Sequence, residues 1–120
     1  MSENNGYLSP YVGDGQDREG KIPAVAGKWS QVSFRYRPIT TYEASQIYAK
    51  SRVFPTEPLV KWWSELLATK ILSWTLKDSK GTALAISVEH LNGLVPEFFD
   101  ALQTYIEIGG QEQLEDAQKN

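Results

Sequence analysis

The sequence contains no cysteine and a single histidine, His90. The absence of cysteine excludes disulfide bonds, thiolate metal sites and cysteine nucleophiles. A metal centre built from several histidines is also excluded, and a catalytic triad would have to use His90. The neighbouring Glu89 is not expected to share a site with His90, because adjacent residues on a helix diverge by about 100°. We therefore expect no catalytic residue, no cofactor-binding residue, no metal ligand and no enzymatic activity.

Long apolar runs and an excess of positive charge are missing as well. The longest apolar-leaning stretch, residues 59–74, contains Lys61, Glu65 and Lys70, and it falls short of the roughly 20 apolar residues of a membrane span. The N-terminus lacks the basic and apolar regions of a signal peptide. Fifteen Asp and Glu residues against twelve Lys and Arg give a net charge of -3, whereas proteins that bind nucleic-acid phosphates are normally basic. We expect a cytoplasmic protein whose partners are neither nucleic acid nor membrane.

The 120 residues are enough for one domain, and glycine and proline divide the chain into three parts. Residues 1–28 hold five of the nine glycines and no continuous apolar face, which predicts an extended or disordered N-terminal arm. Tyr7 and Tyr11 are candidate partner-binding residues in this arm, as anchors that order only against a partner. Residues 29–108 are the predicted folded domain, and residues 109–120 are a polar C-terminal tail.

Local patterns predict one strand and one helix at the start of this domain. Apolar and polar residues alternate over residues 29–37, which is typical of a half-buried strand. Thr40 and Glu43 then have the spacing of a capping box, so a helix is expected to begin near Thr41 and to end at residues 50–52.

The strongest helical pattern follows Thr56, a good N-cap residue. From there apolar residues recur at helical spacing as far as Trp74, so the helix is expected to include that residue. Asp78 to Gly81 has the composition of a turn, and the flanking residues 74–77 and 83–86 are expected to pair as a short hairpin. The alternative for these flanks is an extended loop packed on the helices.

Two further helices complete the predicted fold. One is short, with Ser87 as its N-cap and Gly93 as its C-cap, and the other runs from Pro96 to Ile108 until Gly109 ends it. The predicted fold class is therefore α+β and mainly helical: a small helical domain with a short β-strand or hairpin element and an extended N-terminal arm. The expected apolar stripe of the last helix consists of Val95, Phe98, Phe99, Leu102, Tyr105 and Ile106.

Three side chains of the domain are candidate partner-binding residues. Arg35 and Arg37 share one face of the predicted strand, and in an acidic chain this face favours an acidic partner segment over nucleic acid. One helix of a small domain can hardly bury both Trp62 and Trp63, so Trp62 is the predicted aromatic contact. The basic strand face and the acidic residues 97–120 also favour head-to-tail self-association into a homo-oligomer.

Two stretches of the domain resemble small proteins encoded in the tail-gene region of tailed bacteriophages. They are residues 32–40, VSFRYRPIT, followed by Glu43, and residues 71–81, ILSWTLKDSKG, followed by a capped short helix and a final amphipathic helix. The likeness covers about residues 30–108. It implies a non-enzymatic role in virion morphogenesis, most like that of the tail assembly chaperones. Those proteins are thought to keep the tape-measure protein soluble while tail-tube subunits polymerise around it, so the implied partners are other phage tail or structural proteins.

Two alternatives remain beside the chaperone. The glycine-rich arm departs from the chaperone pattern and favours a virion structural subunit, such as a decoration, neck or minor tail protein, that uses the arm as an assembly clamp. The alternative from another class is a small cytoplasmic adaptor or regulatory domain without a viral connection. The phage interpretations place the protein in the host cytoplasm during assembly, or in the virion.

Overall fold

The computed structural model describes residues 11–12, 15–50 and 57–109. Strand β2 (Val32–Tyr36) is the central strand of a three-stranded antiparallel sheet with the order β1-β2-β3. Its alternation is as predicted: Val32, Phe34 and Tyr36 are buried, whereas Arg35 is exposed on the opposite face. The strand is shorter than residues 29–37, the range expected from the alternation.

Strand β1 (Arg18–Ile22) lies within the range that the sequence assigns to an extended arm. It pairs with β2 along its whole length, so the ordered domain begins before residue 29. The alternation is hard to detect because its buried face contains Gly20, which has no side chain. An added Cβ at Gly20 would lie 2.6 Å from Cζ of Phe34 and 2.7 Å from Cε1 of Tyr105. Glycine is therefore required for the close approach of these two rings to the strand.

Helix α1 (Thr41–Lys50) begins at the predicted capping box. The Thr40 hydroxyl accepts a hydrogen bond from the Glu43 N–H at 3.1 Å, and the Glu43 carboxylate accepts one from the Thr40 N–H at 2.9 Å. These reciprocal bonds satisfy backbone donors that a helix N-terminus otherwise leaves unpaired. The predicted start and cap of this helix are confirmed.

Helix α2 (Glu57–Lys70) ends four residues earlier than its apolar periodicity predicts. The next residues form strand β3 (Ile71–Trp74), which pairs with β2 and places Trp74 opposite Phe34. The prediction of a helix as far as Trp74 is therefore wrong. Pairing with the exposed edge of β2 outweighs the local helical pattern over one turn, and a short apolar run is compatible with either structure. The predicted N-cap, Thr56, lies outside the described residues.

The C-terminal helices have the predicted bounds and caps. In α3 (Val88–Asn92) the Ser87 hydroxyl accepts from the His90 N–H at 3.1 Å. Helix α4 (Pro96–Ile108) ends at Gly109, which has a left-handed φ of 95°. The expected hairpin before α3 is reduced to a single β-bridge between Lys77 and Ala83.

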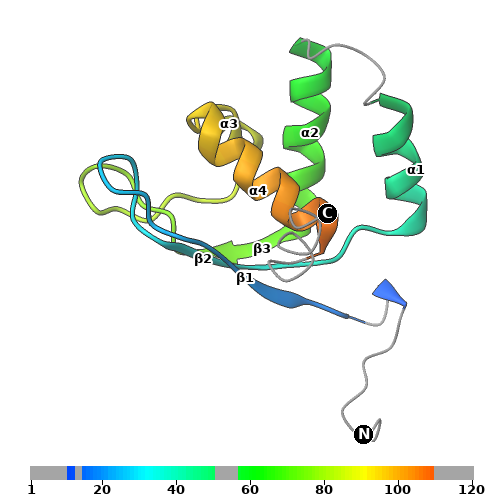
Figure 1. Cartoon of the computed structure of the whole chain (residues 1–120), viewed down its shortest axis with the longest axis horizontal. Helices are drawn as coiled ribbons and strands as arrows, with labels where there is room; N and C mark the ends of the chain where they lie inside the picture. Colours follow the sequence, from blue (N-terminus) through cyan, green and yellow to red (C-terminus); the bar gives the residue numbers. More distant parts are fainter. Residues whose placement is uncertain (1–10, 13–14, 51–56, 110–120) are drawn as a thin grey trace, which may run out of the picture.

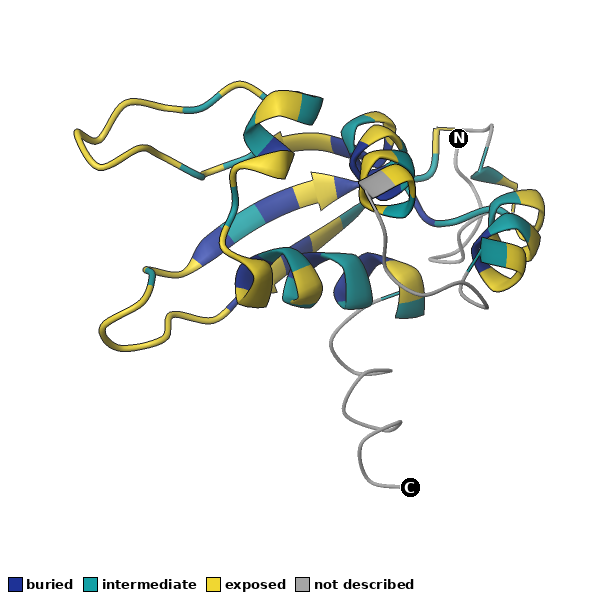
Figure 2. Cartoon of the chain, turned by 90° about the horizontal axis from the view of Figure 1, so that it is seen from above, coloured by how far each residue is buried: buried dark blue, intermediate teal, exposed yellow. Residues whose placement is uncertain are grey.

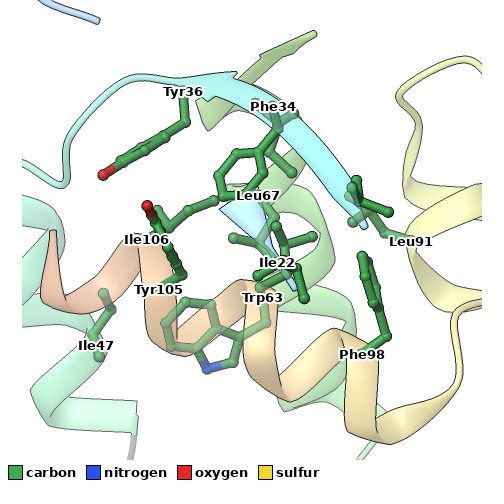
Figure 3. Packing of buried hydrophobic residues seen from close by; sticks show 13 residues of the cluster. Ile22, Phe34, Tyr36, Ile47, Trp63, Leu67, Leu91, Phe98, Tyr105 and Ile106 are labelled. Carbon is green, nitrogen blue, oxygen red and sulfur yellow. The ribbon is translucent and has the colours of Figure 1, made fainter. Parts of the chain in front are cut away.

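All four helices lie on one side of the sheet, and no described helix covers the other side (Figure 1). The predicted α+β class is confirmed. No helix in the described part of the chain is long and apolar enough to cross a bilayer. Between the two layers the buried side chains of β1, β2, β3 and the helices form one core (Figure 3). Its fully buried large side chains are Tyr36, Leu67, Leu91, Leu102 and Ile106.

Candidate functional site: a groove between helices α2, α3 and α4

A groove of about 440 Å³ opens between α2, α4 and the connection from α3 to α4. Trp63 and Leu91, which are both core residues, lie at its base. Leu59 of α2 and Phe99 of α4 are half-buried and form its walls. The groove is therefore lined mainly by apolar side chains that belong to three different elements.

One exposed valine lines the groove, and a second precedes a lining residue. Val60 of α2 lines the groove with 45% of its surface exposed. Val95 is 54% exposed and directly precedes the lining residue Pro96, but it does not itself line the groove. Val95 was predicted to belong to the buried stripe of α4, and that prediction is wrong. Its backbone is extended (φ -65°, ψ 145°) at the N-cap position, so the residue does not continue the face of the helix.

Polar groups lie at the margin of the groove. Asp100 and Gln103 line it from α4, and Asn92 lines it from the end of α3. The Asn92 amide oxygen accepts a short hydrogen bond from the hydroxyl of the fully buried Ser64. This bond fixes α3 to α2, so the two helices that bound one side of the groove are held together by a polar contact and by apolar packing.

Trp62, the predicted aromatic contact, lies outside this groove and is half-buried. Its ring packs edge-to-face on Trp63 with a centroid separation of 5.5 Å, and the Lys50 ammonium lies 5.4 Å from the Trp62 centroid. Trp62 instead lines a smaller hollow of about 270 Å³ between α1 and α2, together with the exposed Tyr42. Its partner-binding role stays a prediction.

Arg35, predicted to meet an acidic partner, is bound by two carboxylates of its own chain. Its guanidinium donates to Asp17 at 2.8 Å and to Glu19 at 3.0 Å on the open face of the sheet. The hydrogen bond to Asp17 and the charges of both carboxylates raise the pKa of Arg35 above its ordinary value. At this position the open face therefore presents one positive and two negative side chains, and the Arg35 charge is already paired within the chain.

Two of the other predicted partner-binding residues, Arg37 and Tyr11, lie in the described part of the chain. The half-buried Arg37 follows β2, and its backbone N–H donates to the Lys70 carbonyl at 2.8 Å, which links the end of β2 to the end of α2. Tyr11 is 67% exposed. Tyr7 lies outside the described residues. Neither Arg37 nor Tyr11 lines the groove.

The single histidine, His90, lies within α3. The Nδ1 atom of His90 is 2.6 Å from the Ala85 carbonyl oxygen, so the ring holds the segment before the helix. Within residues 11–12, 15–50 and 57–109, no three His, Asp or Glu side chains are grouped closely enough to hold a metal ion.

Sequence reasoning did not identify the groove. Its apolar residues lie mainly on α2, α3 and α4. The sequence pattern of each helix, taken alone, predicts only a side that faces the core. The available signal was local: Val60 lies next to Lys61 on the polar side of α2, and Val95 precedes a proline. Val60 is therefore an apolar residue at a position where burial is not expected, whereas Val95 was expected in the apolar stripe of α4.

Comparisons of the chain with protein-family models, with curated proteins and with solved structures found no match in any of the three. Function therefore has to be inferred from the groove and from the surfaces around it.

Proposed function

We propose that this protein is a non-enzymatic bacteriophage morphogenesis protein, most like a tail assembly chaperone, that binds an amphipathic helix of a tail protein. The binding site is the groove between α2, α3 and α4. The observation that carries the proposal is the exposed Val60 beside a base formed by Trp63 and Leu91. Apolar grooves between helices are a common way to bind the apolar face of a partner helix.

The polar margin of the groove favours a partner with a basic residue. Asp100 is exposed and lines the groove on the α4 side. A lysine or arginine beside the apolar stripe of the bound helix would complement this carboxylate. A partner with an acidic residue at that place would be disfavoured by like-charge repulsion. The proposed partner segment is therefore amphipathic and basic.

The resemblance to phage tail-region proteins supports the phage context. It depends on a tryptophan strand, an acidic–glycine turn, a capped short helix and a final amphipathic helix. Strand β3 contains Trp74, and the turn is held by the Asp78 carboxylate, which accepts from the Lys80 and Thr82 N–H groups at 2.9 Å. Helices α3 and α4 follow in the expected order.

The proposal is tested in cells that produce particles from the genome carrying this gene. Disruption of the gene should leave capsids without tails in electron micrographs, and the wild-type gene should restore tailed particles. Val60→Glu places a charge in the groove and should fail to restore them. Leu72→Glu is the matched control, because Leu72 is 42% exposed on β3, outside the groove, and this variant should restore tails.

Two results would contradict the proposal. Tailed particles in normal number after disruption would exclude a role in assembly. Full rescue by Val60→Glu would exclude the groove as the binding site. Circular dichroism of the purified variant checks that a failure to rescue is not caused by loss of the fold. Mass spectrometry of purified virions then separates the two phage roles, since a chaperone is absent from the particle and a structural subunit is present at stoichiometric copy number.

A further inference from the structure

Strand β1 forms one edge of the sheet. It is an edge strand and pairs only with β2. Within β2, Ser33 directs its backbone toward β3: its N–H donates to the Thr75 hydroxyl and its carbonyl accepts from the Thr75 N–H, both at 2.9 Å. Successive residues of an antiparallel strand direct their backbone groups to opposite sides. Phe34 therefore directs its N–H and carbonyl toward β1.

The alternating direction of the backbone groups along β2 determines which backbone groups of β1 face away from the sheet. Phe34 lies opposite Gly20, so the Gly20 backbone is used in pairing with β2. The flanking residues, Glu19 and Lys21, direct their N–H and carbonyl groups outward. Among the described residues none forms a further strand along this edge. Both side chains are exposed on the open face of the sheet.

We propose that this edge pairs with the same edge of a second copy of the chain, antiparallel about a two-fold axis at Gly20. In this register Glu19 lies opposite Lys21 of the second copy, and Lys21 lies opposite Glu19 of the second copy. Each of these pairs exchanges both of its outward N–H···O=C bonds. The result is a continuous six-stranded sheet with an isologous interface.

The charges select this register over its neighbours. With the axis at Gly20, each exposed carboxylate meets an ammonium group directly across the strands. An axis at Glu19 or at Lys21 would place two like charges opposite each other, which is destabilising. Gly20 also leaves no side chain at the crossing point on the helical side of the sheet. The sequence of β1 is thus complementary to itself in one antiparallel register.

One further contact holds β1 in position for pairing. The Arg18 guanidinium donates to the Gly109 carbonyl at the C-terminus of α4, at 3.1 Å. A cation at this end of a helix is favoured by the helix dipole. The edge strand is therefore attached to α4 as well as to β2.

The opposing interpretation is that the edge is protected against pairing. Lysine and proline on edge strands are features by which proteins prevent edge-to-edge association. Here Lys21 meets a carboxylate in the proposed register, and Pro23 follows the last residue of the ladder. A protein that stays monomeric would establish the protective role instead.

The proposal does not depend on the proposed function, because β1 contributes no residue to the groove between α2, α3 and α4. It also differs from head-to-tail association through the basic strand face, because the interface is the same edge in both copies. A dimer without phage function, or a phage function without a dimer, would each be recognised by its own experiment.

Charge reversal tests the register in the full chain. Sedimentation velocity from about 1 µM to about 1 mM should show the 13.5 kDa monomer in equilibrium with a particle of twice that mass. Lys21→Glu and Glu19→Lys each place like charges in both pairs, and each should raise the dissociation constant by about tenfold or more. An equimolar mixture of the two variants restores both opposite-charge pairs and should restore the dimer.

Two features of the design separate the interface from general charge effects. Lys80→Glu makes the same charge change in the exposed turn after β3 and should leave the dissociation constant unchanged. Glu19→Lys also removes one partner of Arg35, but Arg35 keeps its bond to Asp17 at 2.8 Å. A wild-type chain that is monomeric at every concentration overturns the proposal. So does a dimer that both reversals leave unaffected, because it must be formed by another surface.

Amide hydrogen exchange gives a residue-specific check. At low concentration the outward N–H groups of Glu19 and Lys21 should exchange rapidly, and the Gly20 N–H should already be protected by β2. At high concentration the Glu19 and Lys21 amides should become protected while Gly20 changes little. Equal exchange of Glu19 and Lys21 at both concentrations, in a protein that dimerises, would overturn the proposal.

Discussion

The Lys70 ammonium and the Glu43 carboxylate form an ion pair with an Nζ–Oε1 distance of 2.5 Å between the end of α2 and the first turn of α1. The Lys70 side chain is 6% exposed and that of Glu43 is 21% exposed. Lys70 also donates to the Pro38 carbonyl at 3.0 Å. One ammonium group therefore joins the segment that leaves β2 to the cap of α1 and to the start of β3.

Lys70→Met should lower the free energy of unfolding by about 2–4 kcal/mol, because it leaves a shielded carboxylate and a carbonyl without their cation. Urea denaturation at pH 7 measures the loss. Lys61→Met is the control on the same helix, and because Lys61 is exposed we expect a change of less than about 0.5 kcal/mol. Equal losses for the two variants would show that the buried pair contributes nothing.

The same pair predicts a dependence of stability on pH. Burial acts to raise the pKa of Glu43, but hydrogen bonds from Lys70 and Thr40 together with the charge of Lys70 outweigh it and hold the pKa below its ordinary value of 4.5. The unfolded chain therefore binds a proton at Glu43 more readily than the folded chain does. The stabilisation is present above about pH 4.5 and is lost as the pH falls through the folded pKa.

Glu43→Gln tests this linkage, because the amide does not titrate. The free energy of unfolding should fall less steeply between about pH 5 and about pH 3 in the variant than in the wild type. Glu89→Gln, a change at an exposed carboxyl on α3, should leave the slope as in the wild type. The linkage is absent if the wild type and Glu43→Gln have parallel curves.

The elements that were predictable have their determinants close together in the sequence. The capping box of Thr40 and Glu43, the Ser87 cap and the Gly109 terminator each act within a few residues, and all three are present. Strand β1 and the switch from α2 to β3 depend on pairing with β2, which is distant in the sequence. Local periodicity does not report such pairing.

The same distinction applies to the candidate site. Val60 could be identified as an apolar residue in an exposed place, but its position in a groove depends on the packing of α2 against α3 and α4. Arg35 was identifiable as a strand-face cation. Its acidic partners, Asp17 and Glu19, lie in a segment with no recognisable strand pattern.

Gly20→Ala should destabilise the fold by about 1–3 kcal/mol, because the new Cβ would lie under 3.0 Å from the rings of Phe34 and Tyr105. Both rings are buried in the core and have little room to move (Figure 3). Gly93→Ala is the control, because its Cβ would lie 3.6 Å from the carbonyl oxygens of Glu89 and His90, an ordinary contact distance, and its effect should be smaller. Thermal or urea denaturation of the two variants checks the difference. A Gly20→Ala protein as stable as Gly93→Ala would contradict the close packing.

Trp74→Phe should release the segment that follows β3. The indole N–H of Trp74 donates to the Leu84 carbonyl at 2.7 Å, and the Leu84 N–H donates to the Leu76 carbonyl at 3.1 Å. The loop between β1 and β2 and the loop between β3 and α3 both extend past the helices and are largely exposed (Figure 2). The segment around Leu84 therefore has few other contacts. We expect a loss of about 1 kcal/mol of stability.

Amide exchange of Leu84 should increase more than that of core amides such as Leu102, because the loss is local to the segment. Trp62→Phe removes the same indole atoms from a half-buried tryptophan on α2 and should leave Leu84 exchange unchanged. If Leu84 and Leu102 are accelerated equally in Trp74→Phe, the tryptophan stabilises the whole domain rather than this segment. That outcome would assign its effect to core packing, because the loss of one hydrogen bond to a surface segment does not raise exchange in α4.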